Sequence, residues 1–210
     1  MKAQLLFAMK TALIIVWVIF TTAAAFAQGI INFANNPGTL ISIGIWPPPV
    51  IGPPSLGSYY FALLTAAPGT KDPRQFTFSG LYATNTATAG RFSGGYDIEA
   101  PGWAAGTIKS FMVAGWSASL GQNWNQEWLA GNFDKIGFFG LSGIGTDAAG
   151  GFFGNWPLPP MNVFGGALGI PSGFSLFPVP AVPEPAAASL AALGVAMLIA
   201  YRRNRPPTSR

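Results

Sequence analysis

The sequence predicts a mainly β protein, in which an antiparallel β-sandwich-like ectodomain lies between an N-terminal signal peptide and a C-terminal transmembrane helix. Between residues 28 and 176, short apolar runs alternate with Gly, Pro, Asn and Ser, and long helical periods are missing. Each end of the 210-residue chain holds a longer uncharged apolar run beside basic residues. Charged residues make up 9% of the chain, against roughly 25% in soluble proteins, and the two apolar ends explain part of that difference.

Residues 1–27 are predicted to be a signal peptide. Two lysines supply its basic first region, and residues 13–20 supply its apolar region. A small-x-small pattern for signal peptidase and the expected first mature residue follow, at Ala25, Ala27 and Gln28. The alternative is an uncleaved signal anchor, because residues 11–27 are uncharged and near the lower length limit of a membrane span.

The ectodomain, residues 28–176, is predicted to consist of short strands joined by turns. A domain of about 150 residues can bury a hydrophobic core without disulfides. The runs expected to form strands are residues 30–34, 40–45, 59–65, 75–82, 90–98, 107–117, 136–141 and 174–177. Residues 123–129 are predicted to be helical, as about two turns inside a loop.

Three proline-rich stretches interrupt this pattern. Residues 46–49 and 156–160 are predicted to be loops, because proline cannot donate a hydrogen bond to a sheet ladder. Residues 177–185, which hold the third stretch and a Pro-Glu-Pro motif, are predicted to be a stiff spacer between the ectodomain and the membrane.

Residues 186–201 are predicted to be a transmembrane helix. The run is uncharged, and its 16 residues would rise about 24 Å as a helix. Because a hydrocarbon core is about 30 Å thick, the span needs local thinning or snorkelling side chains. Residues 202–210 are the predicted basic cytoplasmic tail, which leaves the ectodomain outside the cytoplasm. The arginines that set this topology are Arg202, Arg203 and Arg205.

Charge and composition exclude several kinds of function. The basic charge belongs to the two ends, because residues 28–181 hold five Lys or Arg against six Asp or Glu, a net charge of −1. Nucleic acid is therefore not an expected partner, since its binding needs a basic face. The chain has no Cys and no His, which excludes a disulfide, a Ser-His-Asp triad and a His-ligated zinc site. We expect no cofactor, no metal and no enzymatic activity.

The C-terminal features occur in a specific order: a Pro-Glu-Pro motif, a short apolar run and an arginine-rich terminus. The motif residues are Val182, Pro183, Glu184 and Pro185. This arrangement resembles the PEP-CTERM sorting signal of Gram-negative bacteria that make exopolysaccharide. The resemblance implies processing at or near the motif by an exosortase, a membrane-embedded transpeptidase that resembles cysteine proteases. It also implies an exported protein, anchored in the inner membrane before processing and then located in the cell envelope or extracellular matrix.

One alternative and a second likeness belong beside this interpretation. The C-terminal segment could instead be an ordinary tail anchor preceded by a proline-rich linker. Residues 28–35 are similar to the start of a group of PEP-CTERM proteins in which Gly-x-x-x-Phe-x-Asn opens the mature chain. Residues 108–116 and 138–142 resemble later segments of that group, and this likeness implies no known activity.

Three patterns associated with chemistry are more simply explained as structure. Residues 143–148 match G-x-G-x-x-A, but the Gly- and Phe-rich segment that follows is a poor helix former, so a loop is predicted instead of a dinucleotide site. Asp97 and Glu99 would share one face of a strand, where they could form a glycosidase pair or bind Ca²⁺, but a solvated strand end is the simpler interpretation. Ser117 lacks the final Gly of a nucleophile elbow and any histidine partner.

The tryptophans support one binding hypothesis. Trp124 and Trp128 would be i,i+4 neighbours on the predicted helical piece, beside several carboxamide side chains. Exposed there, they could stack on sugar rings, whereas the alternative is a buried aromatic cluster. The function expected is therefore a non-catalytic structural or interaction role in the cell envelope or extracellular matrix. The alternative function is a carbohydrate-binding module that uses these tryptophans to bind exopolysaccharide.

Overall fold

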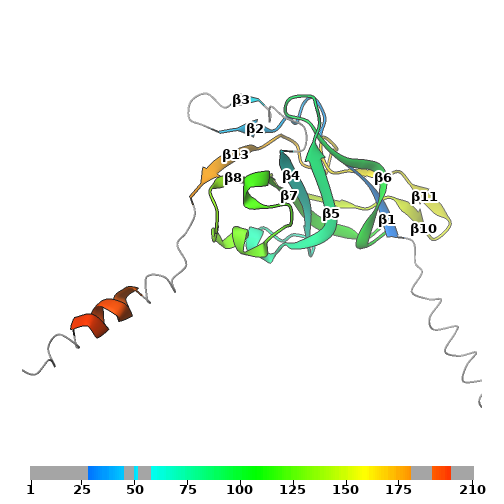
Figure 1. Cartoon of the computed structure of the whole chain (residues 1–210). Helices are drawn as coiled ribbons and strands as arrows, with labels where there is room; N and C mark the ends of the chain where they lie inside the picture. The colour runs from blue at the N-terminus through cyan, green and yellow to red at the C-terminus, as the bar shows by residue number, and fades with distance from the viewer. Residues whose placement is uncertain (1–27, 45–49, 52–57, 181–190, 200–210) are drawn as a thin grey trace, which may run out of the picture.

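Among the residues that the structure describes, eleven strands pair into one curled sheet that contains both parallel and antiparallel neighbours, and two further strands form a separate hairpin (Figure 1). The computed structural model describes residues 28–44, 50–51, 58–180 and 191–199. The strands are β1 (Gln28–Ala34), β2 (Ser42–Ile43), β3 (Val50–Ile51), β4 (Tyr59–Ala66), β5 (Thr77–Asn85), β6 (Phe92–Ala104), β7 (Ile108–Ser117), β8 (Gly137–Leu141), β9 (Gly145–Ala148), β10 (Gly151–Phe153), β11 (Trp156–Leu158), β12 (Met161–Asn162) and β13 (Ser175–Val179). Three 3₁₀ helices are η1 (Pro73–Gln75), η2 (Ala118–Leu120) and η3 (Gln126–Ala130). The prediction of a mainly β protein is confirmed.

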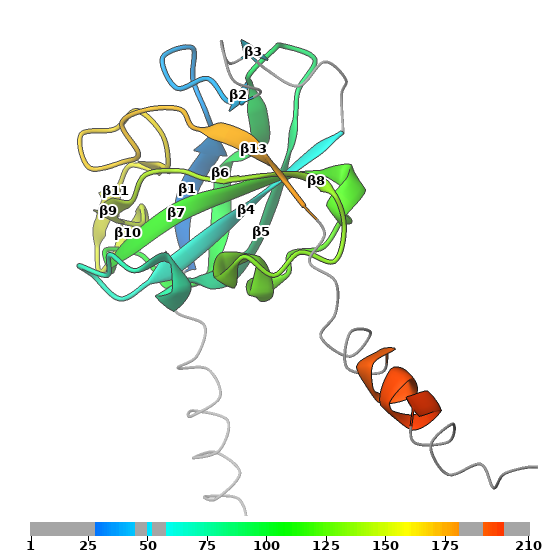
Figure 2. The same ribbon diagram turned by 90° about the vertical axis from the view of Figure 1, so that its left-hand side faces the viewer.

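The large sheet has the strand order β12-β1-β6-β5-β4-β7-β8-β13-β2-β3, with β9 paired to one end of β7. Most neighbours are antiparallel, but β1 with β12 and β13 with β2 are parallel. Register shifts interrupt the β1–β6 and β4–β5 pairings, and such bulges bend a strand and increase its twist. The sheet therefore curls around its own core (Figure 2), whereas the sequence analysis expected an antiparallel sandwich.

Strands β4 and β7 lie next to each other in the middle of the sheet, and both of their faces are buried. They pair antiparallel over eight residues, from Tyr59 opposite Ser117 to Ala66 opposite Ser110. Almost every residue of this part of both strands is buried. A strand covered on both sides has no reason to alternate polar with apolar residues, which explains the nearly continuous apolar runs in the sequence.

Two hydrophobic clusters lie on the two faces of these central strands. The inner cluster fills the curl of the sheet and includes Phe33, Phe61, Phe92, Trp103 and Phe111. The outer cluster lies beneath the segment that holds η2 and η3, and includes Leu64, Phe76, Met112, Trp116 and Trp128. The domain thus has a core inside the curl and a second, aromatic core outside it.

Several predicted segments agree with the observed strands. Residues 30–34 and 59–65 fall in β1 and β4, and residues 107–117 and 136–141 match β7 and β8 except for their first residue. The helix predicted for residues 123–129 is observed as the shorter 3₁₀ helix η3, which begins at Gln126. The side chain of Asn125, the residue before it, accepts a hydrogen bond from the backbone N–H of Glu127 at 3.0 Å. That cap fixes where the helix begins.

Three loop or spacer predictions were wrong. Residues 156–158 form β11, where Pro157 lies opposite Phe152 in a two-stranded hairpin whose edges tolerate proline. Residues 145–148, within the G-x-G-x-x-A match, form β9 and pair with β7. Residues 177–179, assigned to the spacer, belong to β13 and pair with β8.

The chain ends are described only in part. Residues 191–199, inside the predicted transmembrane segment, form a helix with exposed apolar side chains. In the part of the chain that the structure describes, no helix has the length and apolar character needed to cross a membrane. The signal peptide, the proline-rich residues 46–49, the sorting motif and the basic tail lie outside the described residues.

Candidate functional site

A row of four side chains crosses the outer face of the sheet. Trp116 of β7 lies opposite Tyr60 of β4, Tyr60 lies opposite Thr84 of β5, and Thr84 lies opposite Ser93 of β6. Directly opposed residues of neighbouring antiparallel strands point to the same face. Tyr82, two residues before Thr84 on β5, shares that face because side chains alternate along a strand.

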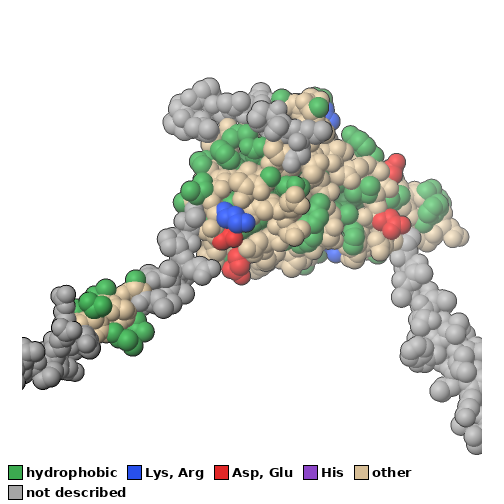
Figure 3. All heavy atoms as spheres, in the orientation of Figure 1, with side chains coloured by type: hydrophobic (Ala, Val, Ile, Leu, Met, Phe, Trp, Pro, Cys, Tyr) green, Lys and Arg blue, Asp and Glu red, His purple; other side chains and the backbone are tan. Residues whose placement is uncertain are grey.

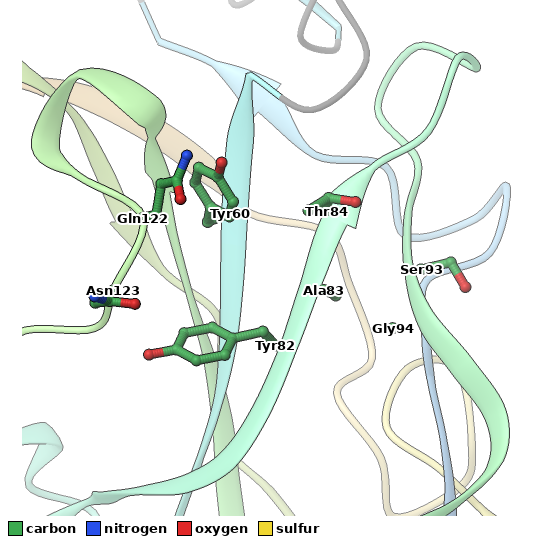
Figure 4. Close-up of a pocket in the computed structure, with 8 residues that line it drawn as sticks. All are labelled: Tyr60, Tyr82, Ala83, Thr84, Ser93, Gly94, Gln122 and Asn123. Atoms are coloured by element: carbon green, nitrogen blue, oxygen red, sulfur yellow. The ribbon is translucent and has the colours of Figure 1, made fainter.

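Three residues of this row, Tyr60, Thr84 and Ser93, line an open hollow of about 390 Å³. Its size is within the range of roughly 300–1,000 Å³ that is typical of small-molecule sites. Figure 4 shows the loop after η2 along one side, β6 along the other, and the two tyrosines between them. The lining residues are Tyr60, Tyr82, Ala83, Thr84, Ser93, Gly94, Gln122 and Asn123. None of them is charged.

Trp116 packs beside the two tyrosines of this hollow, on the same face of the sheet. Its buried indole stacks with Tyr60 at a centroid distance of 6.0 Å and meets Tyr82 edge to face at 6.2 Å. Its Nε1–H donates to the carbonyl oxygen of Gly121 at 2.9 Å. One buried side chain therefore orients both tyrosine rings and holds the start of the neighbouring loop.

Tyr82 holds the other end of that loop. Its hydroxyl oxygen accepts a hydrogen bond from the backbone N–H of Trp124 at 2.9 Å. Residues 121–124 are thus fixed at both ends, by Trp116 and by Tyr82. Gln122 and Asn123 lie between these two points, with exposed side chains.

Most polar side chains around the hollow make no hydrogen bond within the described part of the protein. The hydroxyls of Tyr60, Thr84 and Ser93 and the carboxamides of Gln122 and Asn123 make no hydrogen bond with other described residues. Tyr82 accepts one bond, which leaves its own O–H available as a donor. Six polar groups thus face the opening with capacity to bind a ligand.

The two tryptophans that the sequence suggested as a sugar platform touch edge to face, with ring centroids 5.7 Å apart and an interplanar angle of 84°, so they form no flat stacking surface. Trp128 is 3% exposed and packs on Trp116, Phe133 and Phe139, so it belongs to a buried aromatic cluster, as the alternative from the sequence held, and presents no free face to a sugar. Trp124 is half-buried, and its Nε1–H donates to Gln126 Oε1 at 3.0 Å. Both belong to the outer core because a loop with little regular structure needs large apolar side chains to hold it on the sheet.

The other residues singled out from the sequence have structural surroundings. Asp97 is exposed on β6 with a left-handed φ of 52°, and its backbone N–H donates to Asn32 Oδ1 at 2.9 Å. Glu99 is exposed on the same strand, and neither carboxylate lines the hollow. Ser117 is buried, and its Oγ accepts a hydrogen bond from the backbone N–H of Phe138 at 2.9 Å.

A second surface feature is the β10–β11 hairpin. Phe152, Phe153 and Trp156 are 67%, 60% and 76% exposed, and no charged residue occurs between Asp147 and Glu184. Hydrophobic side chains gather at the end of the domain where Figure 1 places this hairpin, while charged side chains are sparse on the face in view (Figure 3). Sequence analysis missed this feature because it assigned the Trp-Pro stretch to a loop.

Sequence analysis also missed the hollow itself. A local signal existed, since Tyr82 and Thr84 have the spacing of one strand face and Gln122-Asn123 follows a glycine. The register that brings four strands and a distant loop together could not be read from the sequence. The terminal residues singled out from the sequence, which are Ala25, Ala27, the sorting motif and the arginines, lie outside the described part, whereas Gln28 begins β1.

Comparisons with known proteins add no relative. The chain matches no protein-family model, no curated protein and no solved structure.

Proposed function

We propose that this chain is an exported protein of the cell envelope or extracellular matrix with a non-catalytic structural or interaction role. The observation that carries the role is the hollow, whose lining offers hydrogen-bonding groups on a fixed frame and contains no carboxylate, amine or guanidinium. Such a lining supports recognition of a ligand more than its chemical conversion, because general acid–base catalysis needs a group that titrates near the working pH.

The two chain ends support the location. A basic and apolar first segment with Ala25 and Ala27 before Gln28 is typical of signal-peptidase substrates. The order of the Pro-Glu-Pro motif, apolar run and arginines resembles a PEP-CTERM signal, for which an exosortase is the processing partner and the inner membrane the first anchor. The span predicted for residues 186–201 and the mature location both remain part of this proposal.

Cell fractionation tests the location. In a Gram-negative host with an exosortase, we expect an antibody against the β-domain to detect the wild-type chain mainly beyond the inner membrane. We expect a Pro183→Ala, Glu184→Ala double variant to accumulate in the inner membrane. Glu99→Ala, which removes an exposed carboxylate elsewhere, is the matched control and should fractionate as the wild type. A wild-type chain found in the cytoplasm would refute export, and a motif variant that fractionates normally would refute exosortase sorting.

The second candidate function is a carbohydrate-binding module. Its support is now the hollow between Tyr60 and Ser93, in place of the tryptophan pair, because the open and uncharged lining combines aromatic rings with free hydroxyls and carboxamides.

A further inference from the structure

The hollow on the outer face of the sheet has a definite ligand chemistry. We propose that it binds neutral hexose units of an oligosaccharide or polysaccharide chain. This inference rests on the proposed interaction role of the domain, but it does not depend on where the protein is sorted.

The first step is the absence of charge in the lining. A phosphate, carboxylate or ammonium ligand would lose water on entering the hollow, and none of its lining residues could supply an opposite charge. The lining therefore favours a neutral polar ligand over a nucleotide, an acidic sugar or a charged peptide side chain.

The second step is the kind of hydrogen bond offered. Hydroxyl groups both donate and accept, and a carboxamide presents a donor and an acceptor side by side. Tyr60, Thr84, Ser93, Gln122 and Asn123 supply three hydroxyls and two carboxamides without internal partners. Vicinal sugar hydroxyls, each of which also donates and accepts, complement this mixture on every side of a ring.

The third step is the aromatic floor. Tyr82 is 38% exposed, and it lies between the loop carboxamides and the strand hydroxyls (Figure 4). The C–H face of a hexose is apolar, so it can pack on an aromatic ring while its hydroxyls reach the polar rim. The buried indole of Trp116 packs edge to face against this ring and restricts its orientation.

The fourth step is rigidity and access. The loop that carries Gln122 and Asn123 is fixed by Trp116 at Gly121 and by Tyr82 at Trp124. A site whose groups are already in place loses less conformational entropy on binding. Because the hollow is open to solvent, a sugar in the middle of a polymer can enter as well as a chain end.

Calorimetric titration of the purified full chain, in mild detergent, tests the proposal. The probes are the neutral hexasaccharides of cellulose, laminarin and mannan, with an alginate hexasaccharide as the anionic counter-probe. We expect at least one neutral probe to bind, and to bind more tightly than alginate. Absence of binding by all three neutral probes, or tighter binding of alginate, would overturn the inference.

A pair of matched double variants locates the binding. Gln122→Ala with Asn123→Ala should weaken the best neutral probe by about tenfold or more, since it removes several ligand hydrogen bonds and none within the protein. Gln75→Ala with Asn155→Ala removes the same two exposed residue types outside the hollow and should leave affinity unchanged. Equal affinity in both double variants would contradict the proposed site. Binding by a chain that is not exported would refute the sorting proposal alone, and export without binding would refute this inference alone.

Discussion

Trp116 is the residue on which the outer half of the domain depends most. It is fully buried, contacts Tyr60, Tyr82, Trp124 and Trp128, and donates a hydrogen bond to Gly121. It therefore joins the sheet, the hollow and the covering loop in one set of contacts.

Trp116→Phe should lower the free energy of unfolding by about 2 kcal/mol, because it leaves a cavity and an unpaired carbonyl. Urea unfolding measures this change. The same substitution at Trp156, which is 76% exposed, should alter the free energy by less than about 0.5 kcal/mol. Equal effects at the two positions would show that Trp116 does not organise the outer core.

Tyr59 gives the domain a dependence on alkaline pH. Burial raises the pKa of its phenol above the usual value of about 10, because desolvation disfavours the phenolate. Folding therefore favours the neutral phenol of Tyr59 over its phenolate. Its contribution to stability is complete below pH 10 and is lost as the pH rises from the unfolded pKa through the folded pKa.

Tyr59→Phe should make the loss of stability above pH 10 shallower, because phenylalanine cannot ionise. The midpoint of urea unfolding, measured from pH 8 to pH 11.5 for both proteins, tests this. An unchanged slope in the variant would show that Tyr59 does not contribute to the alkaline transition.

At the scale of elements, the approach of β13 to β8 requires a glycine. A Cβ at Gly140 of β8 would collide with the backbone carbonyl of Ser175 at the start of β13, whereas a Cβ at Gly143 in the following loop would meet nothing within 4 Å. Because the colliding atoms belong to the backbone of Ser175, the collision can be relieved only if β8 and β13 move apart.

Gly140→Ala should therefore lower the free energy of unfolding by about 2–3 kcal/mol, and Gly143→Ala should change it by less than about 0.5 kcal/mol. Thermal and urea unfolding of the two variants provide the comparison. Similar stability of both would contradict the observed packing of β8 on β13.

The β10–β11 hairpin is an element whose aromatic side chains do not support the core. Phe152→Ser with Trp156→Ser should leave the unfolding midpoint nearly unchanged, because both rings are mostly exposed. The double variant should bind less of a hydrophobic dye than the wild type. Ile136→Ser, at an isolated exposed position, is the control, and an equal loss of dye binding there would show that the hairpin aromatics form no distinct patch.

The sequence predicted the central elements well for a physical reason. β4 and β7 have nearly unbroken apolar runs because both faces are buried, so composition alone identifies them. Short edge strands such as β9 and β11 have no such signal, since Gly145–Ala148 and Trp156–Leu158 look like turns until their partners are known. The curl of the sheet depends on bulges and on pairings between distant segments, which no local pattern encodes.

The residues that line the hollow were not predicted from the sequence, and sugar binding stays a prediction. Aromatic and carboxamide residues near position 124 led to a sugar-binding hypothesis, yet Trp128 lies in the outer core and the open rings belong to Tyr60 and Tyr82. The difference arises because the site is assembled across β4, β5, β6 and a loop. Large tryptophans beside such a loop are needed to hold it down.

The whole molecule combines a β-domain that carries a fixed, uncharged hollow with two ends that we propose direct its export. In this proposal the domain binds the ligand and the ends determine the location. These two parts are separable, because the hollow is built entirely within residues 60–123, whereas the sorting features lie before Gln28 and after Val179.

The most direct test of the central claim is the intact mass of the protein recovered from the envelope and extracellular fractions of its producing cells, with sequencing of both ends. The account predicts a chain that begins at Gln28 and ends at or near the motif Val182–Pro185, without the apolar run and arginines that follow. A protein of the full 210 residues, or one found only in the cytoplasm, would contradict it.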